Sequence, residues 1–205
     1  MMEEIITQLR PRITRSEADP RPIVILMCGM AGSGKSTLSK ALISTLPHLT
    51  RLSLDNTVAE KHGLYGINYA PGTTLYDTYL DEAWEECKRR LATLLLSQTQ
   101  QQEQEQEEEK KDIVFDRAFP FKPDRDEIKL LIENLGARWV LIYLRPPDEE
   151  TLWRRICDRR KEGLNGDCAF EITREMLEGW YQGFEIPVGE GAVVVDTLMG
   201  TVGNL

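Results

Sequence analysis

The 205-residue sequence lacks the features that mark several large classes of protein. No apolar run approaches the length of a transmembrane helix, and the N-terminus does not show the basic and then apolar order of a signal peptide. The four cysteines form no C-x-x-C pair and only two histidines are present, so a structural zinc site is disfavoured. We therefore expect a cytoplasmic protein with reduced thiols and no membrane contact.

The sequence also lacks an excess of basic charge. Its formal net charge is -9, which gives no general cationic field for a phosphate backbone, so a nucleic-acid partner is disfavoured. Part of this charge comes from a Gln/Glu-rich tract over residues 98–111, which contains no apolar residue and is predicted to stay outside the core. The length and the hydrophobic content of 41% suit one globular domain with a small lid.

A glycine-rich stretch after the first long apolar run fits a phosphate-binding pattern. Residues 29–36 match G-x-x-x-x-G-K-[ST], in which backbone N–H groups wrap phosphates, the lysine reaches the β- and γ-phosphates, and the hydroxyl meets Mg²⁺. An apolar strand over residues 23–28 precedes it, and a helical pattern follows it until Pro47. The sequence therefore predicts a P-loop. Its predicted nucleotide-binding residues are Gly29, Ala31, Gly32, Ser33, Gly34, Lys35, Ser36 and Thr37.

Strand and helix patterns alternate along the rest of the chain. This alternation is typical of a three-layer α/β domain, in which helices cover both faces of a parallel sheet. We predict a P-loop domain over residues 23–205, a helical lid over about 148–170, and a leader outside the core over residues 1–22. The five predicted strands cover residues 23–28, 51–54, 112–116, 139–144 and 192–195.

Polar side chains follow the predicted strands at the sheet edge where such folds bind ligands. Asp55 follows the second strand, where it is either a general base for an acceptor hydroxyl or the N-cap of the next helix. Asp116 ends the third strand, where it either orients hydrated Mg²⁺ together with Ser36 or binds the acceptor. Arg117 is either a substrate clamp or part of an Asp-Arg surface pair.

Two further groups complete the predicted site. Arg155 and Arg159 share one face of a predicted helix, where they either bind ATP phosphates or pair with nearby carboxylates in solvent. A loop-rich segment over residues 56–75 is interpreted as the acceptor region. Within it, the side chains of His62, Tyr65 and Tyr69 either contact the substrate or pack as ordinary loop residues.

Three classes of P-loop protein compete for this pattern. A regulatory GTPase is disfavoured because the chain has no N-K-x-D motif and reads Asp116-Arg117-Ala118-Phe119 where a D-x-x-G switch would stand. A motor-type ATPase is disfavoured because Arg117 replaces the second acidic residue that activates water. A small kinase needs a base, cationic groups for the moving phosphoryl group and a lid, and the sequence has candidates for all three.

With these residues in place, the chain resembles the P-loop kinases of the polynucleotide kinase, zeta-toxin and chloramphenicol phosphotransferase group over roughly residues 23–197. The resemblance implies a sheet order of 2-3-1-4-5, a catalytic base at Asp55, ATP contacts from Arg155 and Arg159, and an adenine contact near Thr197. The arginine that polynucleotide kinases place shortly after this aspartate is missing. The matching parts are residues 29–37, 54–55, 114–117, 152–159, 184–187 and 195–197.

The sequence therefore favours an ATP- and Mg²⁺-dependent kinase that transfers the γ-phosphoryl group to a hydroxyl of a small molecule. Two alternatives stay open at this point, a 5′-hydroxyl polynucleotide kinase and an ATP-hydrolysing switch that reports to a protein partner. The predicted catalytic residues are Lys35, Asp55, Arg117, Arg155 and Arg159.

Overall fold

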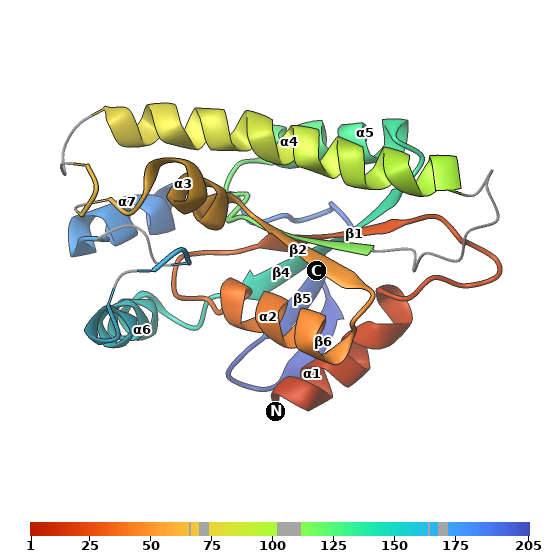
Figure 1. The fold of residues 1–205 in the computed structure, drawn as a ribbon. Helices are drawn as coiled ribbons and strands as arrows, with labels where there is room; N and C mark the ends of the chain where they lie inside the picture. Colours follow the sequence, from red (N-terminus) through yellow and green to blue (C-terminus); the bar gives the residue numbers. More distant parts are fainter. Residues whose placement is uncertain (66, 70–73, 102–111, 164, 168–171) are drawn as a thin grey trace.

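The computed structural model describes residues 1–65, 67–69, 74–101, 112–163, 165–167 and 172–205, and these parts fold around one mixed sheet (Figure 1). The strand order is β2-β3-β1-β4-β5-β6, and β1 to β5 run parallel. The predicted three-layer α/β fold and the order 2-3-1-4-5 are confirmed. The strands are β1 (Ile23–Cys28), β2 (Leu49–Ser53), β3 (Asp112–Asp116), β4 (Arg138–Arg145), β5 (Val193–Asp196) and β6 (Thr201–Asn204).

The sixth strand corrects the prediction of five. β6 pairs antiparallel with β5 at the edge of the sheet. The Asp196 carboxylate accepts hydrogen bonds from the backbone N–H groups of Leu198 and Met199, at 2.9 and 3.0 Å, and so stabilises the turn between the two strands. β6 is short, largely exposed and contains Gly203, so it shows neither a buried apolar run nor a regular alternation.

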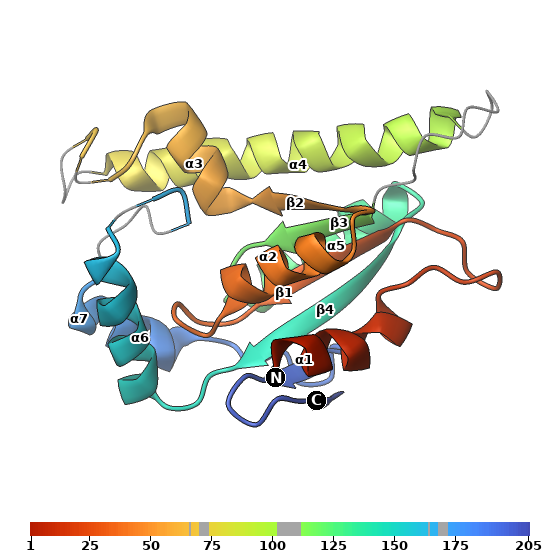
Figure 2. The ribbon, with the colours of Figure 1, turned by 60° about the horizontal axis from the view of Figure 1, so that its bottom comes forward.

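Helices cover both faces of the sheet, because successive strand side chains point to opposite faces (Figures 1 and 2). Leu26 and Phe115 pack under α3, α4 and α5, whereas Ile25 and Val114 pack with α1 and α2. No helix in the described residues is long and apolar enough to cross a membrane. The helices are α1 (Met2–Leu9), the 3-10 turn η1 (Arg10–Arg12), α2 (Lys35–Thr45), α3 (Leu54–His62), α4 (Leu75–Gln101), α5 (Lys122–Asn134), α6 (Glu149–Lys161) and α7 (Arg174–Gly183).

A separate apolar cluster joins the predicted lid to the P-loop. Leu152 and Ile156 of α6 are buried together with Ile172 and with Leu177 of α7. Met30, in the loop after β1, belongs to the same cluster. The helix that carries the predicted lid arginines therefore packs directly on the phosphate-binding loop.

Residues 1–22 contribute to the core, contrary to the prediction that they form a leader outside it. Ile5, Leu9 and Ile13 are at most 1% exposed and pack with α2 and with strand side chains. The side chain of Gln8 also accepts a hydrogen bond from a backbone N–H of β6 at 3.1 Å. The short apolar stripe of α1 is visible in the sequence, but the surface that it covers exists only once β6 has extended the sheet.

Replacing Leu9 by Ala tests this role of α1. The side chain is fully buried, so the substitution is expected to lower the free energy of unfolding by about 2–5 kcal/mol. Chemical denaturation measures the effect. Glu3→Ala on the exposed face of the same helix is the matched control and should change stability by about 0.5 kcal/mol or less. Equal effects of the two substitutions would mean that α1 does not stabilise the fold.

Candidate active site

The P-loop connects β1 to α2 in the predicted position. Gly34 is the N-cap of α2 and has φ 103°, a left-handed conformation that glycine adopts without strain. The backbone N–H groups of Lys35, Ser36 and Thr37 begin the helix, so they have no partner within it and are available to an anion. The loop therefore presents the backbone donors that a phosphate requires.

Gly32 lies where the loop meets α6. Its φ is 77°, and a Cβ at this position would come within 2.9 Å of the Leu152 carbonyl oxygen. The loop and the lid helix thus approach so closely that a side chain at residue 32 would force them apart. Glycine is required here for both its conformation and its size.

Gly32→Ala is therefore expected to weaken ATP binding by about tenfold, because the added Cβ would clash with the Leu152 carbonyl oxygen and displace the loop from α6. Titration with ATP measures the change. The matched control is Gly136→Ala, because Gly136 has φ 75° but has nothing within 4 Å of an added Cβ. It should impose the same backbone strain and leave ATP affinity unchanged. A normal affinity for the Gly32 variant would show that the loop tolerates a displaced α6.

Lys35 and Ser33 supply polar side chains inside the loop. The Nζ atom of Lys35 donates to the Met30 carbonyl oxygen at 2.9 Å. The surrounding protein lowers the pKa of Lys35 by desolvation, while the carboxylates of Asp116 and Asp55 oppose this change. The buried Oγ of Ser33 has no hydrogen-bond partner among the described residues. Both side chains are therefore candidates for binding phosphate oxygens.

Asp55 lies in the first turn of α3 and is close enough to Lys35 to affect the pKa of that lysine. The N-cap of this helix is Ser53, whose side chain accepts a bond from the Asn56 N–H at 3.4 Å, so the alternative interpretation of Asp55 as N-cap is wrong. Solvent reaches the side chain, but the many protein atoms around it reduce its hydration and raise its pKa to about 6. Asp116 raises this pKa further, while Lys35 lowers it.

Asp116 ends β3 beside Ser53 of β2 and Met27 of β1. Arg51 of β2, a residue that the sequence analysis missed, donates to its carboxylate from Nε at 3.1 Å and from Nη2 at 2.6 Å. Because Arg51 lies within β2 and not at the end of a strand, only the pairing of β2 with β3 reveals its role. The charge of Asp116 is thus partly compensated by an arginine that is almost fully buried.

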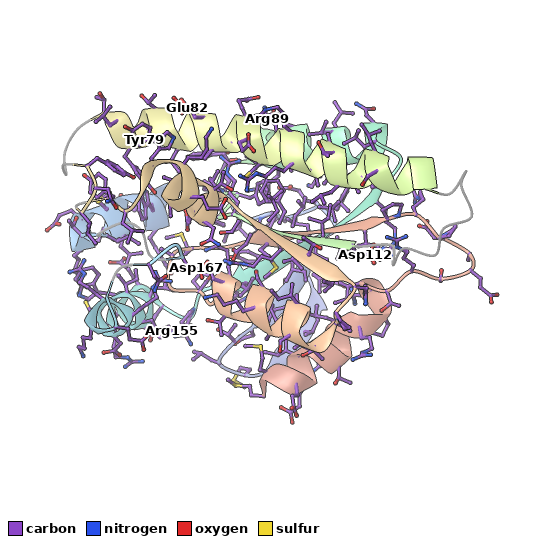
Figure 3. The ribbon with its side chains drawn as sticks, in the orientation of Figure 1. Tyr79, Glu82, Arg89, Asp112, Arg155 and Asp167 are labelled. Atoms are coloured by element: carbon purple, nitrogen blue, oxygen red, sulfur yellow. The ribbon has the colours of Figure 1, made fainter. Side chains whose placement is uncertain are left out.

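Arg155 connects the lid helix to two parts of the predicted nucleotide site (Figure 3). Its guanidinium donates to the Gly32 carbonyl oxygen at 3.3 Å and to the Thr197 hydroxyl at 3.4 Å. Thr197 is also a neighbour of the P-loop, since a Cβ on Gly34 would lie 3.7 Å from its methyl group. Arg159, one turn further along α6, is close enough to Asp55 and Lys35 to shift the pKa of each.

Arg117 lies elsewhere, contrary to its interpretation as a substrate clamp. Its guanidinium donates to the Asp124 carboxylate at 2.9 Å and stacks 4.1 Å above the ring of Trp84, in the layer formed by α4 and α5. Adjacent chain positions direct Asp116 and Arg117 to opposite faces of the sheet. Burial lowers the pKa of Arg117. Arg117 thus pairs with an aspartate, but the pair is not the predicted surface pair, since the Arg117 side chain is only 18% exposed.

The predicted loop-rich acceptor region begins as a helix, since α3 covers it up to His62, whereas the described residues 63–65 and 67–69 are not helical and contribute to an aromatic cluster. α3 extends to His62, and the ring of His62 stacks on Tyr79 of α4 at 3.7 Å. Tyr65 and Tyr69 pack edge to face with each other at 5.5 Å and contact α4. Tyr76, where Asp55 reinforces the rise in pKa caused by burial, joins this cluster to the candidate base. Figure 3 shows Tyr79 and Glu82 on the same helix.

Comparison with known proteins assigns the family. A family described as AAA domain matches residues 24–187, which is most of the chain. The chain belongs to this family. The predicted resemblance to P-loop kinases is confirmed by this family and by the fold, and the domain is a nucleotide-binding P-loop NTPase. No curated protein has a significantly similar sequence.

Solved structures resemble this AAA domain in fold. A candidate kinase from Chloroflexus aurantiacus has a TM-score of 0.65 and 20% identity, covering 86% of this chain and 89% of the other. Kti12 from Chaetomium thermophilum, in complex with ADP-AlF3, has a TM-score of 0.53 and 16% identity, and the match covers 85% of the present protein and 89% of Kti12. A chain of the Pnkp1/Rnl/Hen1 RNA repair complex has a TM-score of 0.59 and 16% identity. The match covers 80% of the present protein but only 44% of the length of that chain.

Proposed function

We propose that this AAA domain is an ATP- and Mg²⁺-dependent kinase that transfers the γ-phosphoryl group of ATP to a hydroxyl of a small molecule. The observation that carries the proposal is the position of Asp55. Its pKa is raised to about 6, and it lies close enough to Lys35 and Arg159 for their charges to act on it. Such a group is ionised at neutral pH and still basic enough to accept a hydroxyl proton. A protein that only binds nucleotide has no use for a base at this point.

The donor half of the site fits ATP. The N–H groups at the start of α2 and the side chains of Lys35 and Arg155 would bind the phosphates, and Thr197 would lie near the adenine. Ser36 and Asp116 would hold Mg²⁺, with phosphate oxygens and water completing its ligands. The ion would reduce the charge on the phosphates during transfer. Lys35 and Arg159 would stabilise the negative charge of the phosphoryl group as it moves from ATP.

The acceptor half favours a small molecule over a polynucleotide. The carboxylates of Asp55, Asp116 and Asp167 influence this region, and the whole chain carries a net charge of -9, so a phosphate backbone would meet little attraction. The aromatic cluster around Tyr76 would contact the non-reacting part of the acceptor. We propose His62, Tyr65 and Tyr69 as members of this contact surface, together with Tyr79.

A screen for acceptor-stimulated ADP release tests the function. Pools of hydroxyl-bearing metabolites are incubated with the protein and Mg·ATP, and each active pool is repeated with Asp55→Asn. A phosphorylated small molecule that appears only with the unaltered protein is the expected result. Phosphorylation of oligonucleotides with strong salt dependence would favour a polynucleotide kinase instead. If no pool stimulates ADP release and a protein partner binds in a nucleotide-dependent way, the protein is a switch instead of a kinase.

A further inference from the structure

Asp167, on the segment after α6, is a carboxylate that belongs neither to the P-loop nor to the candidate base or metal ligands. The side chain of Asp167 is 14% exposed and forms ion pairs with Arg51 of β2 and with Lys40 of α2. Its backbone N–H is held by the Asn165 side chain at 2.9 Å. Figure 3 shows Asp167 beside α2. Asp167 therefore attaches this segment to both β2 and α2.

The attachment lies close to the candidate base. Arg51 donates to both Asp116 and Asp167, so one guanidinium joins a candidate site carboxylate to the segment after α6. The neighbouring Gly166 packs so tightly on Asn56 of α3 that a Cβ would overlap the Asn56 side chain. Asp55 is the residue before Asn56, and the charge of Asp167 is among those that act on it.

Two contacts thus fix α6 on either side of Arg159. Arg155 holds the middle of the helix to Gly32 and Thr197, and Asp167 holds the chain beyond its end. The Nε atom of Arg159 is buried and has no hydrogen-bond partner among the described residues. An arginine whose Nε has no partner in the described part of the chain, and whose charge acts on both Lys35 and Asp55, is placed to meet a phosphoryl oxygen.

We propose that Asp167 is a positioning residue for phosphoryl transfer, because its ion pairs with Arg51 and Lys40 hold the end of α6 so that Arg159 faces Lys35 and Asp55. The inference rests on the proposed function of this site as a phosphoryl-transfer centre. Without these pairs, α6 stays attached through Arg155 and its apolar side chains. Small rotations of α6 about that attachment would then move the Arg159 guanidinium away from Lys35 and Asp55.

Hydrolysis of Mg·ATP tests the inference without an identified acceptor, since water takes its place and ADP release is measured. Asp167→Asn is expected to lower kcat by about 10- to 100-fold, because small misplacements of a charged group are costly. The KM for ATP should stay within about twofold, because the P-loop and Arg155 still bind the nucleotide. Asp167→Glu keeps the charge and should recover most of the rate. Asp158→Asn is the control, since Asp158 is an exposed carboxylate of the same helix that pairs with Lys161.

A second background separates positioning from a general loss of structure. In an Arg159→Ala protein, Asp167→Asn should change kcat by about twofold or less, because the group through which it acts is gone. Lys40→Gln removes one ion pair at a side chain that is 58% exposed and should cause a smaller loss of the same kind. Independent, multiplying effects of the Asp167 and Arg159 substitutions would overturn the proposal. So would a rise in KM for ATP with kcat unchanged.

The two proposals fail in different ways. If no hydroxyl acceptor exists, the kinase assignment fails while the dependence of ATP hydrolysis on Asp167 and Arg159 can still be measured. If Asp167→Asn matches the unaltered protein while Asp55→Asn abolishes phosphorylation of an acceptor, only the positioning role is wrong. Faster turnover of acceptors that carry a carboxylate or phosphate in the Asp167→Asn protein would also overturn it, because Arg51 and Lys40 would then be an acceptor-binding pair.

Discussion

Asp55→Asn is expected to lower kcat for phosphorylation of the acceptor by about 10²–10⁴-fold, the range over which a positioned general base acts. The amide keeps the shape of the side chain but cannot accept the proton that leaves the hydroxyl. ATP binding should stay near normal, since the proposed phosphate contacts come from the P-loop and α6. Steady-state kinetics with the acceptor found by the screen measure the change.

The matched control is Glu60→Gln, an exposed carboxylate on the same helix that pairs with Arg90 at 3.0 Å. It should leave kcat unchanged. If Asp55→Asn also retains full turnover with a true acceptor, the carboxylate is not the base, and Asp116 becomes the next candidate.

The ionisation of Asp55 should make both kcat/KM and stability depend on pH. The base acts only when ionised, so kcat/KM should fall as the pH drops through about 6, and this acidic limb should be absent from the residual activity of Asp55→Asn. Between its ordinary pKa of 3.8 and about 6, the folded protein holds more protons at this site than the unfolded chain. Asp55 therefore costs stability as the pH rises through that window. Asp55→Asn should raise Tm at pH 7.5 more than at pH 4.

Lys35→Ala is expected to weaken ATP binding and to lower kcat by roughly 10²–10³-fold, the cost of removing one charge-stabilising donor from a reaction site. Its ammonium is the cation that the loop encloses and that both Asp116 and Asp55 attract. Binding of a fluorescent ATP analogue and ADP release measure the two effects.

Lys61→Ala, an exposed lysine on α3, is the control for the loss of one positive charge and should have no effect on either measurement. Normal ATP binding by Lys35→Ala would contradict every version of the site, because each requires the loop to hold phosphates.

Local patterns allowed the sequence to predict much of this architecture. The P-loop residues form a contiguous motif between a buried strand and a helix, and the apolar strands of a parallel sheet are covered on both faces, so they read as continuous runs. The carboxyl ends of β1 to β5 lie at one edge because these strands run parallel, which is how Asp55 and Asp116 were predicted to lie near the loop. The helical spacing of Arg155 and Arg159 likewise predicted a shared face.

Local patterns could not predict the contacts between segments that are far apart in the sequence. The helix cap at Ser53 and the turn at Asp196 depend on a few hydrogen bonds that no periodicity records. β6 and α1 stabilise each other across almost the whole chain, so neither has a strong signal alone. The structure therefore supplied the sixth strand and brought the N-terminal helix into the core.

The sequence by itself determined that this protein is a P-loop α/β domain with carboxylates at the ligand-binding edge of its sheet, because these features follow from local patterning. The tertiary structure alone decided which charges meet there. Arg51 reaches Asp116 and Asp167 because β2 pairs with β3 and the chain after α6 folds back over α2. Arg117 points into the layer under α4, although it is the next residue after Asp116. Ion pairs form between residues far apart in sequence, so only the folded chain determines them.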